Sequence, residues 1–167
     1  MIRNTSGFSL MEMMVVVAIV AITSAIAIPN LIGRLPAYRL SSASSDVLSV
    51  LQNARLRAVK EFANVVVDFD VPNNKYKVFL DNGRGGGTAY NGEQDGTELT
   101  LMEKTVPNGV TIHSAGFSSQ QRIEFNSQGG LYRSKNSYMG GNVELKSSAG
   151  ETKKIIVNIA GLSRIEV

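Results

Sequence analysis

The sequence predicts an α+β protein, with a long N-terminal hydrophobic helix that continues into an amphipathic helix packed on an antiparallel β-sheet body. Three observations predict this class. Apolar residues predominate in the N-terminal segment as far as Pro29. They then recur at three- and four-residue spacing to about Glu61. After Ala63 the spacing falls to two, and β-branched and aromatic residues dominate.

The composition limits what the chain can do. Its 167 residues are 43% hydrophobic and 19% charged, which fits one globular unit with an appended segment and excludes an intrinsically disordered chain. The absence of cysteine excludes disulfides, thiol catalysis and iron–sulfur clusters, and a single histidine, His113, excludes a multi-histidine metal site. We therefore expect no cofactor, no metal and no enzymatic activity. A net charge of +3 permits an acidic partner without requiring one.

The N-terminal segment is the most informative part of the chain. Residues 8–28 carry one charge, Glu12, and as a helix would span about 31 Å, enough to cross a bilayer. One interpretation is a secretory signal peptide with Arg3 as its positive region and a cut after Ala27. Another is a plain membrane anchor. Glu12 fits both poorly, because a carboxylate within an apolar segment costs of order a few kcal/mol without a partner.

The motif Gly7-Phe8-Ser9-Leu10-Met11-Glu12, followed by an apolar run to Val20, resembles the type III signal of type IV pilins and type II secretion pseudopilins. The resemblance implies that prepilin peptidase cuts between Gly7 and Phe8, and that Phe8 is N-methylated. It implies that Glu12 meets the amino terminus of a neighbouring subunit, and Pro29 matches the family's helix-bending proline. Residues 1–7 would then be a leader peptide. Residues 8–29 would be a single-pass anchor in a bacterial inner membrane, with the body in the periplasm or outside, and later a filament core.

The helical pattern continues beyond the anchor. Residues 30–39 contain Gly33 and Pro36, which predict a bend or a local interruption. A second helix is expected from about Ser45 to Glu61, capped by Ser44 or Ser45 if it restarts there, so that residues 30–63 extend the anchor. Its predicted apolar face consists of Val47, Leu48, Leu51, Ala54, Arg55, Ala58, Val59 and Phe62. Three basic residues, Arg55, Arg57 and Lys60, are interpreted as a solvated face.

Residues 64–167 form the predicted β-rich body. Runs of alternating residues separated by turns of Gly, Pro and Asn define the strands. The expected strands are Asn64–Asp70, Lys75–Leu80, Leu99–Lys104, Val110–His113, Arg122–Phe125, Leu131–Arg133, Asn142–Lys146, Lys153–Ile159 and Leu162–Val167.

The second half resembles one subfamily, pseudopilin H of type II secretion and the minor pilin called fimbrial protein T. The resemblance rests on Ala54-Arg55 with Ala58, the hairpin ending Phe79-Leu80-Asp81-Asn82-Gly83, Ile123-Glu124-Phe125 with Gly129, and the closing hairpin with Gly161 and Arg164. It implies a minor subunit near a filament tip, whose partners are prepilin peptidase and other pilin or pseudopilin subunits. Whether the filament serves secretion or a pilus stays open.

Nucleic acid is the alternative partner. Fimbrial protein T is associated with DNA uptake through a Gly-Arg-x-Arg motif, and here Gly161 and Arg164 match while Leu162 replaces the first arginine. Arg133 and Lys135, beside Tyr132, form the other basic cluster. A lone arginine adds little beyond non-specific phosphate attraction, so nucleic-acid binding is not expected. A DNA-binding minor pilin and a secreted soluble domain remain the alternatives.

Other motifs carry little chemistry. The glycine-rich run at residues 83–87 lacks the Gly-Lys-Ser/Thr ending of a phosphate loop and is interpreted as a mobile surface loop. The acidic residues around it lack EF-hand spacing and are interpreted as solvated, although calcium binding stays open. The possible oxygen ligands are the acidic residues Asp81, Glu93, Asp95 and Glu98 and the amide Asn82. Asp68 and Asp70, beside a hairpin turn, are also interpreted as solvated acids.

Overall fold

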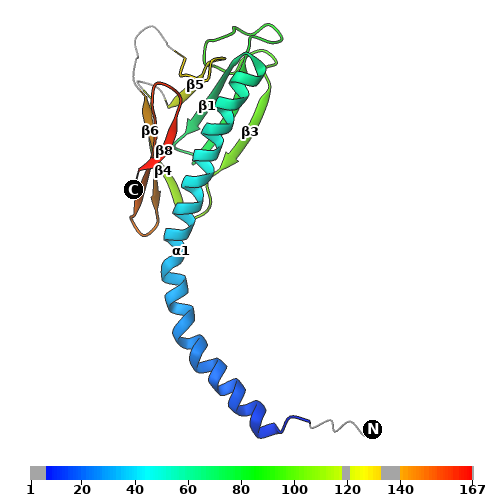
Figure 1. Ribbon diagram of the computed structural model, residues 1–167, viewed down its shortest axis with the longest axis vertical. Coiled ribbons are helices and arrows are strands. Elements are labelled where there is room, and N and C mark those ends of the chain that lie inside the picture. Colours follow the sequence, from blue (N-terminus) through cyan, green and yellow to red (C-terminus); the bar gives the residue numbers. More distant parts are fainter. Residues whose placement is uncertain (1–6, 118–120, 133–139, 167) are drawn as a thin grey trace. The chain divides into compact units, whose positions relative to one another are not determined.

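The computed structural model describes residues 7–117, 121–132 and 140–166 (Figure 1). Its elements are α1 (Leu10–Glu61), β1 (Asn64–Asp70), β2 (Lys75–Asp81), β3 (Thr100–Thr105), β4 (Val110–Gly116), β5 (Arg122–Phe125), β6 (Gly141–Ser147), β7 (Thr152–Val157) and β8 (Ser163–Glu166). The chain divides into two compact units, Met1–Leu35 and Pro36–Val167.

Helix α1 is continuous from Leu10 to Glu61. The interruption suggested by Gly33 and Pro36, with a restart and cap near Ser45, is therefore absent. A proline removes one backbone donor at a cost of about 3 kcal/mol, and the helical turns on both sides offset that cost. Ser44 lies inside the helix, where its buried Oγ donates to the Leu40 carbonyl at 2.7 Å instead of capping a new start.

In the second unit, one face of α1 is buried. The buried residues are Leu40, Ala43, Ser44, Val47, Val50, Leu51, Ala54 and Ala58. The predicted face was wrong at its end, because Val59 is 43% exposed and Phe62 is 82% exposed. The helix ends at Glu61, and Phe62 follows in the left-handed region at φ 52° while Ala63 N–H donates to the Ala58 carbonyl at 3.3 Å. This Schellman turn directs the Phe62 side chain outward.

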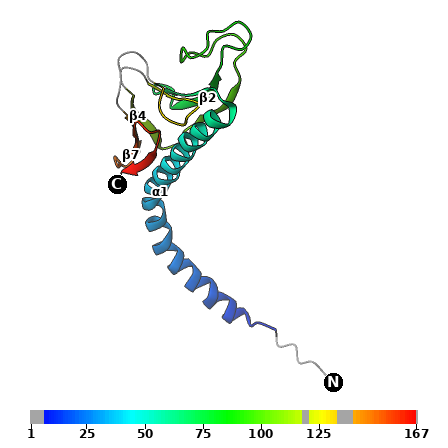
Figure 2. The ribbon, with the colours of Figure 1, turned by 45° about the horizontal axis from the view of Figure 1, so that its top comes forward.

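The strands form two antiparallel sheets of four, β3-β2-β1-β5 and β4-β6-β7-β8. The sequence predicted antiparallel strands without revealing two sheets. In this unit α1 packs against both sheets (Figure 1 and Figure 2), and Leu51, Phe125 and Leu145 lie in one shared core. Burying these apolar side chains stabilises the body.

Most strand predictions agree with the structure. Asn64–Asp70 and Arg122–Phe125 match, and the strand predicted from Val110 continues past His113 to Gly116. The strand predicted at Leu131–Arg133 was wrong in its described part, where Leu131 makes only an isolated bridge to Phe125. Its last residue, Arg133, lies outside the described residues, as does Val167 at the end of the final predicted strand.

Candidate functional site

The N-terminal motif lies in an exposed stretch before α1. Among the described residues other than its chain neighbours, no atom lies within 4 Å of the position that a Cβ on Gly7 would occupy, and Phe8 is 75% exposed. Ser9 caps the helix, because its Oγ accepts the Glu12 N–H at 3.2 Å. With glutamate three positions on, Ser9-x-x-Glu12 has the pattern of a capping box, a local signal that the sequence analysis missed. The helix thus begins two residues after Phe8, and Glu12 lies in its first turn.

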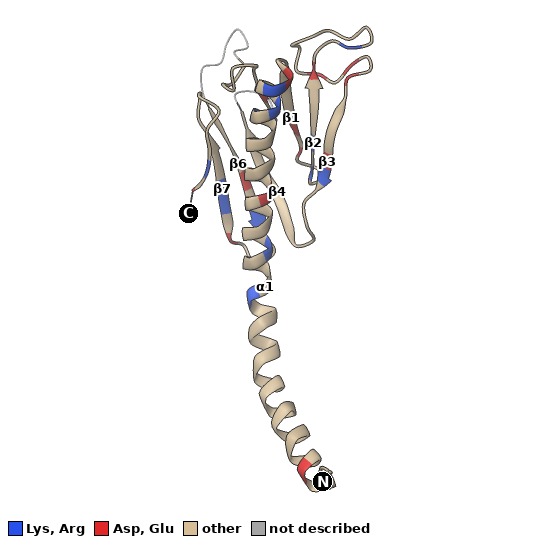
Figure 3. Ribbon diagram, turned by 45° about the vertical axis from the view of Figure 1, so that its right-hand side comes forward, with Lys and Arg blue, Asp and Glu red and all other residues tan. Residues whose placement is uncertain are grey.

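The first unit exposes its apolar side chains all round the helix. Between Gly7 and Leu35, every described residue except Ser24 is exposed. Charges lie only near the ends of this stretch, at Glu12 and Arg34 (Figure 3). Among the described residues, α1 is the one helix long and apolar enough to cross a membrane. A helix that is apolar on every side needs lipid or protein around it.

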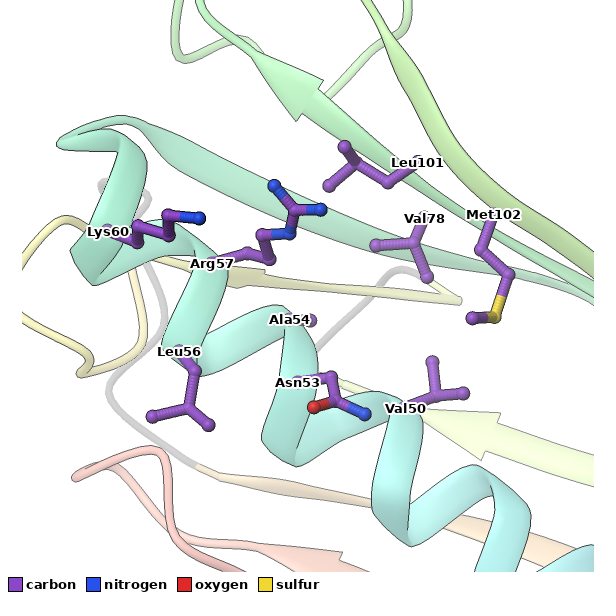
Figure 4. A pocket seen from close by; sticks show the side chains of 9 residues that line it. All are labelled: Val50, Asn53, Ala54, Leu56, Arg57, Lys60, Val78, Leu101 and Met102. Carbon is purple, nitrogen blue, oxygen red and sulfur yellow. The ribbon is translucent and has the colours of Figure 1, made fainter.

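A groove lies in the second unit between the last turns of α1 and strands β2 and β3 (Figure 4). Its volume is ≈ 420 Å³, and its lining residues are Val50, Asn53, Ala54, Leu56, Arg57, Lys60, Val78, Leu101 and Met102. Arg57 pairs with Glu61 at 2.9 Å. No local sequence pattern indicates this groove, because it depends on the placement of β3 beside the helix.

Arg55 has a packing role that the sequence analysis did not predict. It was interpreted as part of a solvated basic face, but its Nε donates to the Gly129 carbonyl at 2.7 Å and the side chain is half-buried. Gly161 lies against the same junction with φ 75°, and a Cβ there would clash with the Gly129 carbonyl oxygen. Gly161 therefore serves the packing of a tight turn.

Of the four residues considered for DNA binding, the structure describes only Gly161 and Arg164. Arg164 lies exposed on β8, paired in register with Ile156 of β7. Arg133 and Lys135 lie outside the described residues.

Two of the five residues predicted to be solvated around the loop between β2 and β3, Asp81 and Glu98, are buried, whereas Glu93 is exposed as predicted. Asp81 is 0% exposed and accepts the N–H groups of Tyr90 at 2.5 Å and Gly92 at 2.7 Å. Glu98 is 7% exposed and accepts the N–H groups of Asn82 and Gly83 at 2.9 and 2.8 Å. The prediction was wrong for these two residues because the backbone N–H groups of the glycine-rich loop have no β-strand partner. They donate hydrogen bonds to the two carboxylates instead.

Glu124 of β5 lies beside this loop. Burial raises its pKa to about 7, the nearby Asp81 carboxylate adds to the rise, and Arg122 opposes it. Arg122 also donates to the Gly92 carbonyl at 2.6 Å, which ties the loop to β5. Burial likewise raises the pKa of Asp81, against the lowering effect of its two backbone hydrogen bonds. Within the described residues, no three acidic or histidine side chains are arranged to hold a metal ion.

The remaining singled-out residues have ordinary surroundings. Asp68 pairs with Lys77 across β1 and β2 at 3.7 Å. Asp70 accepts the backbone N–H and the side-chain amide of Asn73 at 3.2 and 2.7 Å, which fixes the hairpin turn. His113 is exposed on β4.

Known proteins share both the sequence motifs and the fold. The family model described as type II transport protein GspH matches residues 43–161, and the prokaryotic N-terminal methylation motif matches residues 2–28. No curated protein sequence matches the chain.

Two solved structures show the same fold. The minor pseudopilin EpsH of the Vibrio cholerae type 2 secretion system is 12% identical, with a TM-score of 0.55 over 77% of this chain and 97% of that one. The type IV minor pilin FimU of Pseudomonas aeruginosa PAO1 is 16% identical, with a TM-score of 0.55 over 77% of this chain and 88% of that one.

Proposed function

This chain belongs to the family of GspH type II transport proteins, and we propose that it is a minor pilin-like subunit of a type II secretion pseudopilus or a type IV pilus. In this proposal it joins the filament near its tip after cleavage by prepilin peptidase. The family consists of structural subunits of secretion and pilus filaments, so the proposed activity is assembly rather than catalysis.

One observation carries the proposal. The helical stretch from Leu10 to Leu35 is apolar on every side and exposed, with a single carboxylate, Glu12, four residues after Phe8. A secretory signal peptide would be discarded and would have no use for Glu12. A retained segment can rest in the bilayer and later pack against the same segments of other subunits. Apolar surface then stays away from water throughout extraction.

Glu12 gives the assembly its register in this proposal. Cleavage after Gly7 creates a cationic amino group at Phe8 and makes Glu12 the fifth residue of the mature chain. A carboxylate in an apolar bundle is stable only with a partner, and a neighbouring subunit offers its Phe8 amino group. The ion pair would form at one axial offset only, because elsewhere along the apolar stretch the carboxylate finds no cation.

The proposed processing requires access to the Gly7–Phe8 bond. The exposed, side-chain-free position of Gly7 and its place before the Ser9 cap support such access. The anchor would span residues 8–29, with residues 30–63 as its extension and residues 64–167 as the body held in the periplasm or outside.

Glu12→Ala tests the assembly role. The sequence has no cysteine, so single cysteines introduced between Leu10 and Ile28 report neighbours without background. In cells that make the other subunits, we expect the variant to be cleaved normally but to lose most cross-links to neighbouring subunits. Glu61→Ala, at the far end of α1, serves as the matched control and should cross-link normally. Undiminished cross-linking of Glu12→Ala would show that this carboxylate has no docking role.

A further inference from the structure

The groove between α1 and strands β2 and β3 has an apolar floor that the body itself does not fill (Figure 4). Val50, Ala54 and Val78 form its buried side. Met102 lies in the same lining and is still 41% exposed, and Leu101 is half-buried. Apolar side chains at this depth gain contacts when another apolar side chain enters the groove.

One end of the groove is cationic. Arg57 and Lys60 both line it, and the single carboxylate paired there is Glu61, which contacts Arg57 at 2.9 Å. Lys60 forms no ion pair among the described residues. Beyond Met102, Lys104 is neutralised by Asp46 of α1 at 2.7 Å, so the uncompensated charge lies at the Lys60 end.

Strand β3 forms the outer wall of the groove and the edge of its sheet. The strand order is β3-β2-β1-β5, and in the described part of the chain no other strand pairs with the outer side of β3. The register shifts between Val78 and Phe79, where β3 holds an extra residue, and both Leu101 and Met102 line the groove. A free strand edge beside an apolar groove favours a ligand in extended conformation.

We propose that this groove binds an extended segment of a second protein that carries an apolar side chain next to a carboxylate. The apolar side chain packs on Val78 and Met102, the carboxylate pairs with Lys60 and Arg57, and the segment's backbone runs along the edge of β3. Charge complementarity selects the acidic partner over a basic one. The proposal does not depend on the filament role, because it rests on the groove alone.

A random-peptide phage library panned against the full chain in non-ionic detergent tests the proposal. We expect enriched peptides to combine an acidic residue with a nearby aliphatic or aromatic one. Synthetic versions of these peptides should bind Met102→Glu about tenfold more weakly, since the new charge repels the carboxylate and removes apolar contact. Lys60→Glu should weaken them severalfold and should gain binding to peptides whose acid is replaced by lysine.

Matched controls separate the groove from the rest of the surface. Leu162→Glu makes the same change at a side chain that is 55% exposed and lies outside the groove, and Lys154→Glu reverses an exposed charge on β7. Both should bind as the wild type does, and thermal unfolding should show all four variants folded. Enriched peptides without acidic residues, or binding that Met102→Glu and Lys60→Glu leave unchanged, would overturn the proposal.

Discussion

Helix α1 contains two stretches with the same backbone and opposite surroundings. From Leu10 to Leu35 its large apolar side chains are exposed, for example Val17 at 62% and Ile22 at 65%. From Pro36 to Glu61 it buries one face, with Leu51 at 0% and Leu40 at 1% exposed. The second stretch is amphipathic and finds its cover in the sheets of its own chain. The first is apolar all round, so its cover has to come from outside the chain.

The largest expected effect is on solubility, and it follows from removing most of the uncovered stretch. We expect a fragment that begins at Asn30 to be a soluble, folded monomer, because its remaining apolar residues are periodic and share one core. The full chain should require detergent. Sedimentation and circular dichroism are the measurements. Aggregation of the fragment, or a spectrum of helix alone, would show that the two stretches are not separable in this way.

Matched leucine truncations sharpen the contrast within one fragment. Leu51→Ala should lower the free energy of unfolding by about 2–5 kcal/mol, because it leaves a cavity in the core. Leu31→Ala, at a side chain that is 60% exposed, should change it by no more than about 0.5 kcal/mol. Urea unfolding of the fragment that begins at Asn30 measures both. Equal losses would mean that the first stretch also has a covered face.

The pH dependence of stability should differ between a glutamate in the covered body, Glu124, and one in the uncovered stretch, Glu12. The pKa of Glu124 is raised to about 7 in the fold, so its contribution to stability is fully present below its ordinary pKa and is lost as pH rises through about 7. Glu124→Gln removes the charge and keeps the shape. It should therefore stabilise the full chain above neutral pH by about 1–2 kcal/mol, allowing for partial solvent screening.

The control is Glu12→Gln, in the uncovered stretch, which should leave the stability of the body unchanged at every pH. Thermal unfolding in detergent across the range from acid to mildly alkaline pH is the measurement. If the difference in unfolding temperature between the wild type and Glu124→Gln is the same at every pH, Glu124 does not titrate near pH 7 in the fold.

The smallest effect is expected where α1 ends. Phe62 occupies a left-handed position at φ 52° that glycine adopts without strain, and its side chain is 82% exposed. Phe62→Gly should raise the free energy of unfolding by about 0.5–1 kcal/mol. Leu56→Ala, which truncates an exposed side chain within α1, should be nearly neutral. Destabilisation by Phe62→Gly would reveal contacts that the exposure of the ring does not suggest.

Periodicity explains what the sequence could predict. Val47, Leu51, Ala54 and Ala58 are spaced for one helix face, and Asn64–Asp70 alternates as a strand, so both were predicted from local pattern. The processing motif from Gly7 to Glu12 is local too. Each of these signals lies within a few neighbouring residues.

Contacts between distant residues explain what the sequence could not predict. Arg55 reaches the Gly129 carbonyl, and Asp81 and Glu98 accept backbone N–H groups across a loop. The groove needs β3 beside α1. None of these has a periodic signature. The interruption predicted from Gly33 and Pro36 is absent for the opposite reason, because their local preference is outweighed by a cooperative helix.

The central claim is that the uncovered stretch from Leu10 to Leu35 stays on the mature protein. Intact-mass and N-terminal mass spectrometry of the chain, purified from membranes of a bacterium that has prepilin peptidase, tests this most directly. We predict a mature chain that begins at N-methylated Phe8 and retains Glu12. A mature chain that begins at Ile28 would contradict the claim, because the apolar stretch would then have been a signal peptide removed after Ala27.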